Sequence, residues 1–515
     1  MCLQISEGEP LRFKFFSSDD LGLAADWRPD YFFSPGAELP RLGRVWPVLS
    51  DLKVDLLDGW RFSDSPESDW YLRNIELRDT KARDKNTGEY QRLRVGEKER
   101  VQAEQFRVVI EGERFYRMRH VHAMKLACEA QHFERPGFSD SSICVAPGDV
   151  VVRRVGKVEA AMVSSFHRCH PVDANLAIIR GLNSHQSVWL AYCLNQPLYK
   201  HFLEEQQSAA SVVRVGLKRL GSMPIAPCPA EFVPLAEQFL QAYEAYFGAE
   251  DALSALRGSV QNWLTQRLPA EELTAKPVPR FFKARDLDHR LNYQSAEQAY
   301  IANQLLENHQ CLPLTKLADL STDSDPNSGA SGEDLTDCPV VKIGSLDGQQ
   351  SFQLPKREAE TLWRVHKRPL RCFDVLLSTF SQEPKVAMVS HEPDSSILVS
   401  EQLGVLQFHR TPGAYALLLE TPFIRQQINR LATGTVQRFV QPRMLKKLIL
   451  PPIEDVLAKQ WHRQLLDLLE AKASADKKLK KLSEKMFLVY RQIHPVMDVQ
   501  NVSSNAFDQG DRVNG

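Results

Sequence analysis

Basic side chains gather in two similar segments of this sequence. The later segment, LATGTVQRFVQPRMLKKLILPPI at residues 431–453, has a turn of small residues, then arginine and lysine, then an apolar run that ends in Pro451 and Pro452. Lysine and arginine neutralise phosphates, and arginine also binds guanine in the major groove through two parallel hydrogen bonds. Contact with nucleic acid is therefore the chemistry that these segments predict.

Candidate contact residues lie at corresponding places in the two parts of the chain. In the earlier part they are Arg153, Arg154, Lys157, Arg214, Lys218 and Arg219, with Arg114 and Arg117 of ERFYRMRHVH, where basic groups alternate with aromatic ones. In the later part they are Lys385, Gly434, Thr435, Gln437, Arg438, Arg443, Lys446 and Lys447, and the turn at 434–438 is predicted to lie near DNA. Two simpler interpretations stay open: the basic loops are only solvated, and the turn only closes the core of its domain.

The similarity of the two segments belongs to an internal duplication. Pro197 corresponds to Pro422 at a spacing of 225 residues, and the AMVS tetrapeptides that begin at Ala161 and Ala387 are 226 apart. NLAII and QLGVL are 227 apart, a drift that loop insertions explain. Two similar units suit a ligand that is read at two places with a set separation. A bipartite DNA site is such a ligand, because groove positions recur with each helical turn.

Each copy contains the same predicted series of elements. Short runs rich in valine and isoleucine, such as DVVVRR and DVLLST, predict strands, and VWLAYCLNQ and AYALLLET predict short helices. A long helix follows each copy, because apolar residues at 232–263 and at 465–489 recur at spacings of three and four, with Lys472 interrupting the second series. The two helices are predicted to pair with each other, and packing of each helix on its own domain is the simpler alternative.

These elements predict an α+β fold with two tandem α/β domains, each followed by a long helix, and the helices paired as an antiparallel coiled-coil spacer. A length of 515 residues agrees with more than one domain. The predicted parts are a first domain at 1–229, a helix at 230–268, a second domain at 269–453, a helix at 454–495 and a disordered tail at 496–515.

The composition is that of a soluble globular protein, with 43% apolar and 25% charged residues. The formal net charge is −1, so nucleic-acid binding must come from local basic patches. Nine cysteines without a CxxC pair argue against a zinc ribbon or a disulfide framework and suit a reducing cytoplasm. The N-terminus does not have the pattern of a signal peptide, and we expect no membrane span.

Motifs for catalysis are missing from the sequence. It contains no Walker A motif, HExxH, GxSxG or NPPY-type tetrapeptide. His167, Cys169 and His170 in HRCH resemble metal ligands, but three close ligands without a second pair rarely form a site, and a surface loop is the favoured interpretation. We therefore predict no enzyme, no metal and no cofactor in this chain.

The ordered series of motifs resembles the specificity (S) subunit of type I restriction-modification systems over residues 25–490. The resemblance rests on DWRPDYFFSP, LPLTKLADLS, VVKIGSLDG, FDVLLSTFSQEPKVAMVS, LLLETPFIRQQINRLATGTVQRF and KKLILPPIEDVLAKQ, and it is weaker in copy one, which has a charged insertion at 78–120. It implies a non-catalytic subunit whose two target-recognition domains each read half of a split site on double-stranded DNA. The helices would act as a ruler and dock two methyltransferase subunits, which bind S-adenosylmethionine, and a restriction and translocation subunit would join them.

Other functions are compatible with the same residues. A clamp that binds nucleic acid without regard to sequence would use the duplication and the basic patches equally well. A scaffold or inhibitor that does not touch DNA agrees with the net charge near zero. An enzyme with an unrecognised nuclease or methylase site is the third alternative.

Overall fold

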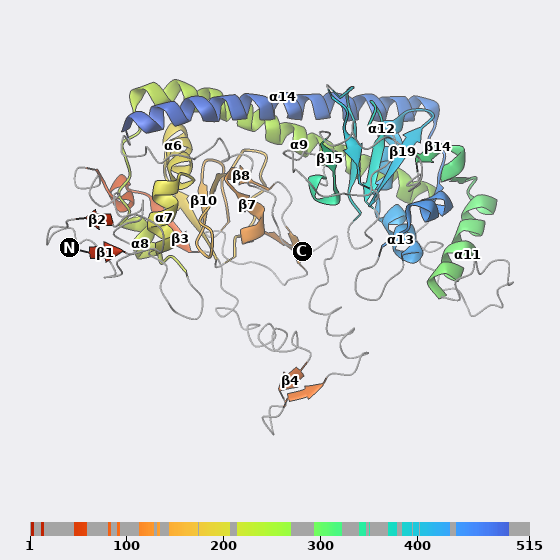
Figure 1. Ribbon diagram of the computed structural model, residues 1–515, viewed down its shortest axis with the longest axis horizontal. Coiled ribbons are helices and arrows are strands. Elements are labelled where there is room, and N and C mark those ends of the chain that lie inside the picture. The colour runs from red at the N-terminus through yellow and green to blue at the C-terminus, as the bar shows by residue number, and fades with distance from the viewer. Residues whose placement is uncertain are drawn as a thin grey trace. The chain divides into compact units, whose positions relative to one another are not determined.

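The chain folds into two compact units. The computed structural model describes residues 2–4, 12–14, 46–58, 81–83, 90–92, 113–127, 131–133, 144–173, 175–205, 214–268, 293–321, 339–346, 350, 369–378, 384–393, 395–400, 402–432 and 439–493. Unit 1 is Met1–Phe247 with Ala475–Gly515, and unit 2 is Gly248–Ser474. The tail predicted at 496–515 lies outside the described residues. Figure 1 labels the elements along the chain.

A mixed sheet forms the centre of unit 1. Its strands, in spatial order, are β3 (Asp55–Asp58), β12 (Leu176–Arg180), β10 (Val150–Arg153), β11 (Ala160–Met162), β8 (Met124–Leu126) and β7 (Val121–His122). All neighbours are antiparallel except β8 and β11, which are parallel. Val150 and Val152 pack into one apolar cluster and Val151 into another. Both faces of the sheet are therefore covered, which is why β10, β11 and β12 are almost continuous apolar runs.

Short helices cover one face of this sheet. They are α6 (Ser184–Leu194), α7 (Pro197–Glu205) and α8 (Leu217–Gly221), with 3-10 turns η2 (Leu49–Leu52) and η6 (Ala230–Phe232). Asn183 begins α6 with a capping box, because its side chain accepts from Gln186 N at 2.9 Å and Gln186 accepts from Asn183 N at 3.1 Å. Trp189 of α6 is buried and donates to Ala226 O at 2.7 Å, which fixes the chain after α8 against the helix.

Three further hairpin-like pairs and one turn complete the described elements of unit 1. They are β1 (Cys2–Gln4) with β2 (Arg12–Lys14), β4 (Lys81–Arg83) with β5 (Tyr90–Arg92), β6 (Glu113–Phe115) with β9 (Gln131–Phe133), and the 3-10 turn η4 (Met118–His120).

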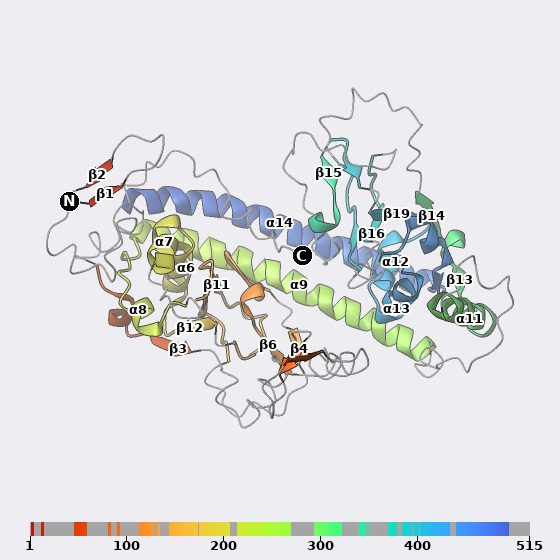
Figure 2. The ribbon, with the colours of Figure 1, turned by 60° about the horizontal axis from the view of Figure 1, so that its bottom comes forward.

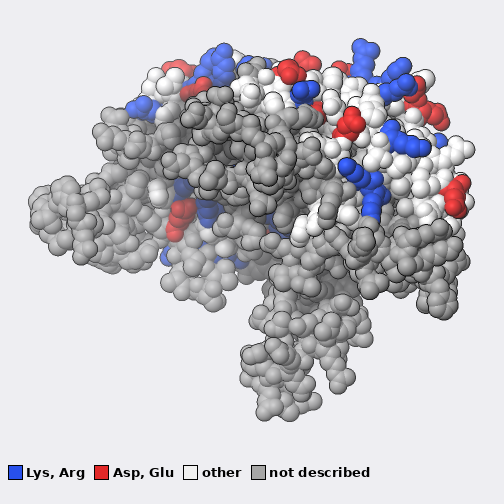
Figure 3. Space-filling model, turned by 45° about the vertical axis from the view of Figure 1, so that its right-hand side comes forward, with Lys and Arg blue, Asp and Glu red and all other residues white. Residues whose placement is uncertain are grey.

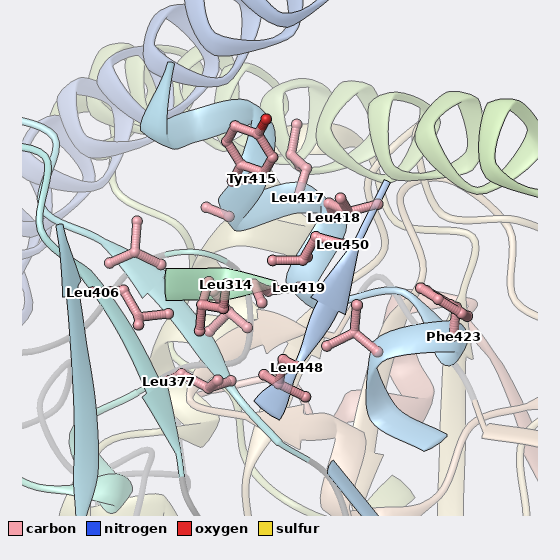
Figure 4. Packing of buried hydrophobic residues seen from close by; sticks show 14 of the residues in the cluster. Leu314, Leu377, Leu406, Tyr415, Leu417, Leu418, Leu419, Phe423, Leu448 and Leu450 are labelled. Carbon is pink, nitrogen blue, oxygen red and sulfur yellow. The ribbon is translucent and has the colours of Figure 1, made fainter. Parts of the chain in front are cut away.

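Unit 2 repeats the arrangement with a smaller sheet. Its strand order is β14 (Ala318–Ser321), β19 (Leu403–Phe408), β16 (Val375–Ser378) and β17 (Val386–Met388), all antiparallel. The helices around it are α11 (Tyr293–Asn308), α12 (Pro412–Leu419) and α13 (Pro422–Leu431). The 3-10 turns are η8 (Leu314–Lys316), η9 (Ile343–Ser345) and η10 (Pro442–Lys447). Two further strand pairs are β13 (Leu312–Pro313) with β20 (Ile449–Leu450) and β15 (Val340–Val341) with β18 (Leu398–Val399). Leu377, Leu406, Leu418 and Leu450 meet in its core, as Figure 4 shows.

The internal duplication is visible in the hydrogen bonds. Val150 pairs with Met162 in unit 1, and Val375 pairs with Met388 in unit 2, at spacings of 225 and 226. The end of each copy returns to its beginning in the same way. Leu49 N donates to Met223 O at 2.9 Å, and Leu314 N donates to Leu448 O at 2.8 Å.

Two long helices, α9 (Val233–Arg267) and α14 (Asp455–Ile493), are each divided between the units. In unit 1, Phe239 and Tyr243 of α9 and Leu479 and Tyr490 of α14 are buried in one cluster. In unit 2, the rings of Trp263 and Trp461 meet edge to face, with centroids 5.4 Å apart. Figure 2 shows both helices among the elements of each unit.

The buried face of α9 differs in part from the predicted series. Leu235 and Tyr246 are only half-buried, whereas Ala236, Tyr243 and Phe247 are buried. The reason is that α9 also packs on the sheet of unit 1, where the Tyr243 hydroxyl donates to Met162 O at 2.7 Å. A strict heptad series does not include this second contact.

A close approach of α12 to α14 within unit 2 requires glycine. Gly413 N donates to His462 Nδ1 at 3.1 Å, and a Cβ on Gly413 would lie 2.7 Å from that nitrogen and 3.2 Å from His462 Cα. We expect Gly413→Ala to lower the free energy of unfolding of unit 2 by about 1–3 kcal/mol, because the backbone of α14 must move. Denaturant unfolding measures this.

The matched control for Gly413→Ala is Gly258→Ala in α9, also in unit 2. A Cβ on Gly258 meets nothing within 4 Å. That variant should be stabilising by up to about 1 kcal/mol, because alanine favours a helix. Equal changes in the two variants would contradict the steric explanation.

Candidate nucleic-acid interface

Basic residues in unit 2 gather where the end of the second copy packs against its beginning. The turn η10 packs against η8, and the bond from Leu314 N to Leu448 O joins the two turns. Lys316 of η8 and Lys446 of η10 are exposed. Lys447 is half-buried, and burial lowers the pKa of its ammonium group. We call Lys316, Lys446 and Lys447 the basic edge of unit 2.

Unit 1 has basic residues at the equivalent place. Helix α8 packs against η2 and β3, and a Cβ on Gly221 would lie 3.0 Å from Leu56 Cδ1 and 3.8 Å from Ser50 Cβ. Lys53, which ends η2 in a left-handed conformation with φ of 55°, is exposed, as is Lys218 of α8. Arg219 beside it is half-buried. Lys53, Lys218 and Arg219 form the basic edge of unit 1.

Sequence reasoning missed Lys53 and Lys316. Each lies more than 100 residues before the basic segment that it joins, so no local pattern connects them. What identifies them is the pairing of an early segment of each copy with the segment at its end. Val48–Leu49 pair with Met223–Pro224 in unit 1, and Leu312–Leu314 pair with Leu448–Leu450 in unit 2.

The predicted group Arg153, Arg154 and Lys157 belongs to an internal network. Arg153 Nη1 lies 3.7 Å and Lys157 Nζ 3.3 Å from the carboxylate of Glu159, which is buried. Arg154 is only 2% exposed. Its burial leaves the Arg154 guanidinium no access to a phosphate in this structure. The charges of Arg153 and Lys157 are partly neutralised by Glu159, so this group is a weaker candidate than the basic edge.

The remaining predicted residues are dispersed. Lys385 Nζ donates to Leu346 O at 2.7 Å, so its ammonium group is held by the protein. Arg214 and Arg117 are half-buried. Gly434, Thr435, Gln437 and Arg438, and the side chains of Arg114 and Arg443, lie outside the described residues.

The HRCH segment has a structural role at its first histidine. His167 is buried, its Nδ1 accepts from Ser164 N at 3.0 Å, and its Nε2 lies 3.0 Å from Leu126 O. Both ring nitrogens therefore bind backbone. Among the residues that the structure describes, no group of three or more His, Cys, Asp or Glu side chains is arranged to hold a metal ion.

Charges of both signs mix on the surface. On the face in Figure 3, the Lys and Arg side chains lie among Asp and Glu side chains rather than in one continuous field. This agrees with the net charge of −1 and makes any attraction of a polyanion local. Within the described residues, no helix is long and apolar enough to cross a membrane.

Comparison of the chain with solved structures finds S subunits of type I restriction-modification systems, the class that the sequence resembles. The HsdS subunit from Thermoanaerobacter tengcongensis is 11% identical, with 77% of this chain and 90% of that chain covered and a TM-score of 0.24. The S subunit from M. genitalium is 11% identical, with 75% and 88% covered and a TM-score of 0.32. A third structure, described by complex assembly and conformational transition of the type I R-M system, is 12% identical, with 77% and 92% covered and a TM-score of 0.24.

No family model and no curated protein matches the chain.

Proposed function

We propose that this chain is the non-catalytic DNA-recognition subunit of a type I restriction-modification or related defence complex, and that it reads a bipartite site on double-stranded DNA. The observation that carries the proposal is the duplication. Both copies close through the same backbone hydrogen bond, 2.9 Å in unit 1 and 2.8 Å in unit 2, and both place lysines beside that closure. A protein with two similar units, each with lysines at the same place, suits a ligand with two similar parts.

The basic edges would supply the contacts to phosphates. Contacts of this kind position a protein on a duplex without reading its sequence. Sequence would be read by the turn at 434–438, where Gln437 and Arg438 have side chains that bind base edges. In this proposal each basic edge binds the sugar-phosphate backbone of the DNA, and the turn at 434–438 enters a groove.

The long helices would set the separation of the two half-sites. The contacts of α9 with α14 in each unit support an antiparallel pair. In the complex that the sequence resemblance implies, two methyltransferase subunits dock on these helices and bind S-adenosylmethionine, and a restriction and translocation subunit joins them. Such an arrangement belongs in the cytoplasm, where the DNA is.

The basic edge of unit 2 can be tested through the dependence of binding on salt. We expect Lys316→Ala with Lys446→Ala to weaken binding of the full chain to a random-sequence DNA duplex. The slope of log K against log salt concentration should become shallower by about 1.8, because each lost phosphate contact removes about 0.9. Fluorescence anisotropy over a salt series measures the slope.

A matched control removes two positive charges elsewhere on unit 2. Lys459 and Arg463 are exposed on α14, away from η8 and η10 in the sequence, and Lys459→Ala with Arg463→Ala should leave the slope almost unchanged. Equal slopes for the two double variants would show that the basic edge is not a contact surface.

Recognition of a DNA sequence by this chain is tested separately. Deletion of the gene should remove a split adenine-methylation motif from the host methylome.

A further inference from the structure

Two largely buried ion pairs in unit 2 join the first copy of the duplication to the second. Arg257 of α9 binds Glu420, which lies between α12 and α13, with Nε 2.7 Å from Oε2 and Nη2 3.1 Å from Oε1. Glu250 of α9 lies 3.1 Å from Lys472 of α14, and these two side chains are 7% and 9% exposed. Lys472 is the residue that interrupts the apolar series of its helix. Its charge is therefore matched by an acid on the helix that follows the other copy.

These pairs have a consequence because the chain is duplicated. The two halves of the chain, residues 1–268 and 269–515, have the same order of elements, so each half offers another copy of itself a surface of similar shape. We infer that the two ion pairs prevent such like-with-like pairing, so that the first half of this chain packs on the second half and rejects a second copy of itself.

Pairing of the first half with another first half would leave buried charges unmatched. At a spacing of 225, the residue equivalent to Lys472 is Phe247, which is buried as Lys472 is, so Glu250 would face an aromatic ring. The residue equivalent to Glu420 is Asn195, so Arg257 would meet a neutral amide. In unit 1, Asn195 is engaged with its own copy and exchanges hydrogen bonds with Ala160 N and O at 3.2 and 2.7 Å.

Pairing of the second half with another second half fails in the same way. At the same spacing the residue equivalent to Arg257 is Leu482, so the carboxylate of Glu420, 8% exposed, would lose the guanidinium that binds it and keep only the attraction of Arg425. The residue equivalent to Glu250 is Ala475, so Lys472 would face a methyl group instead of a carboxylate. A buried charge without a partner is strongly destabilising, and rejection of wrong partners by unpaired charge is a common source of specificity. The Lys125–Asp476 pair at 2.7 Å does not discriminate, because the residue equivalent to Asp476 is Asp251, which is also acidic.

The experiment uses the full chain and reverses one pair. Glu250→Lys and Lys472→Glu alone each place like charges in a buried site, and each should lower the melting temperature of unit 2 by about 6 °C or more. The two changes together should restore most of that loss. The control is the Arg267–Glu454 pair, which also joins the two halves but is 4.0 Å long and 33% and 77% exposed. Its single reversals should shift the melting temperature by less than about 2 °C.

Co-expression of the two single variants with different affinity tags tests partner choice directly. A Glu250→Lys chain and a Lys472→Glu chain are mismatched within themselves but complementary to each other. They should therefore co-purify as a pair, whereas two parent chains with different tags should not. The inference is overturned if the double reversal is no more stable than the single ones, or if the co-expressed variants do not associate. Both outcomes are independent of DNA binding and so separate this inference from the proposed function.

Discussion

Unit 1 should lose stability as the pH falls below about 6.5, because of His120. This side chain is 7% exposed and its Nδ1 accepts from Arg117 N at 2.9 Å, so the folded protein holds the imidazole neutral. Burial, with the neighbouring charges of Arg119, Arg117 and His122, lowers the pKa of His120 from 6.5 to about 3.

The sign of the effect follows from this lowered pKa. Below pH 6.5 the unfolded chain binds a proton that the folded chain does not, so protonation favours unfolding. The stability contributed by His120 is complete above pH 6.5. It is lost progressively as the pH falls from 6.5 through about 3, the pKa of the folded state. Over the whole interval the loss is on the order of 5 kcal/mol.

Denaturant unfolding of the parent and of His120→Asn at several pH values measures this contribution. Asparagine keeps an acceptor for Arg117 N but does not titrate, so the variant should show a flatter dependence of unfolding free energy on pH. His409→Asn is the control, because His409 in unit 2 is half exposed. If His120→Asn and the parent lose stability in parallel, His120 is not the group that titrates.

Glu420→Ala should be the most destabilising substitution of a charged residue in unit 2. It removes the partner of Arg257 and leaves the guanidinium in a largely buried site. Burial raises the pKa of Glu420, and Arg257 opposes that shift more than Gln350 or Arg425 does, so Arg257 is the main partner of the carboxylate. We expect a loss of about 3–5 kcal/mol in the free energy of unfolding.

Calorimetry of the unit 2 transition checks this result against Glu454→Ala. Glu454 is 77% exposed beside Arg267, and its removal should change stability by no more than about 0.5 kcal/mol. Glu420→Gln, which keeps the shape of the side chain, should lie between the two. Equal losses for Glu420→Ala and Glu454→Ala would mean that Arg257 is stable without its partner.

The strands and short helices could be predicted from the sequence because their apolar runs are covered on both faces. Val150–Val152 and Val375–Leu377 are buried throughout, so a simple count of apolar residues finds them, and the repeat at 225 supports each assignment with the other. The bounds of α9 and α14 lie within the predicted helices at 230–268 and 454–495.

The candidate interface was less predictable, because exposure and pairing depend on residues distant in sequence. Arginine is usually found at the surface, but Arg154 is buried, and Glu159 binds its neighbours Arg153 and Lys157. Lys472 was recognised as an interruption, but its partner Glu250 is 222 positions away on another helix. No local pattern contains that information.

The division of the chain has a consequence for its synthesis. Unit 1 is formed by residues on both sides of unit 2, so all of unit 2 is inserted within it. Domains generally fold as they leave the ribosome, from the N-terminus onward. In this chain the order is reversed for the final step: unit 2 is complete once Ser474 has emerged, whereas the core of unit 1 must wait for Leu479, Met486 and Tyr490. The core of unit 1 is therefore completed after unit 2, and the nascent chain must keep the earlier part of that core from aggregating until residues 475–490 have emerged.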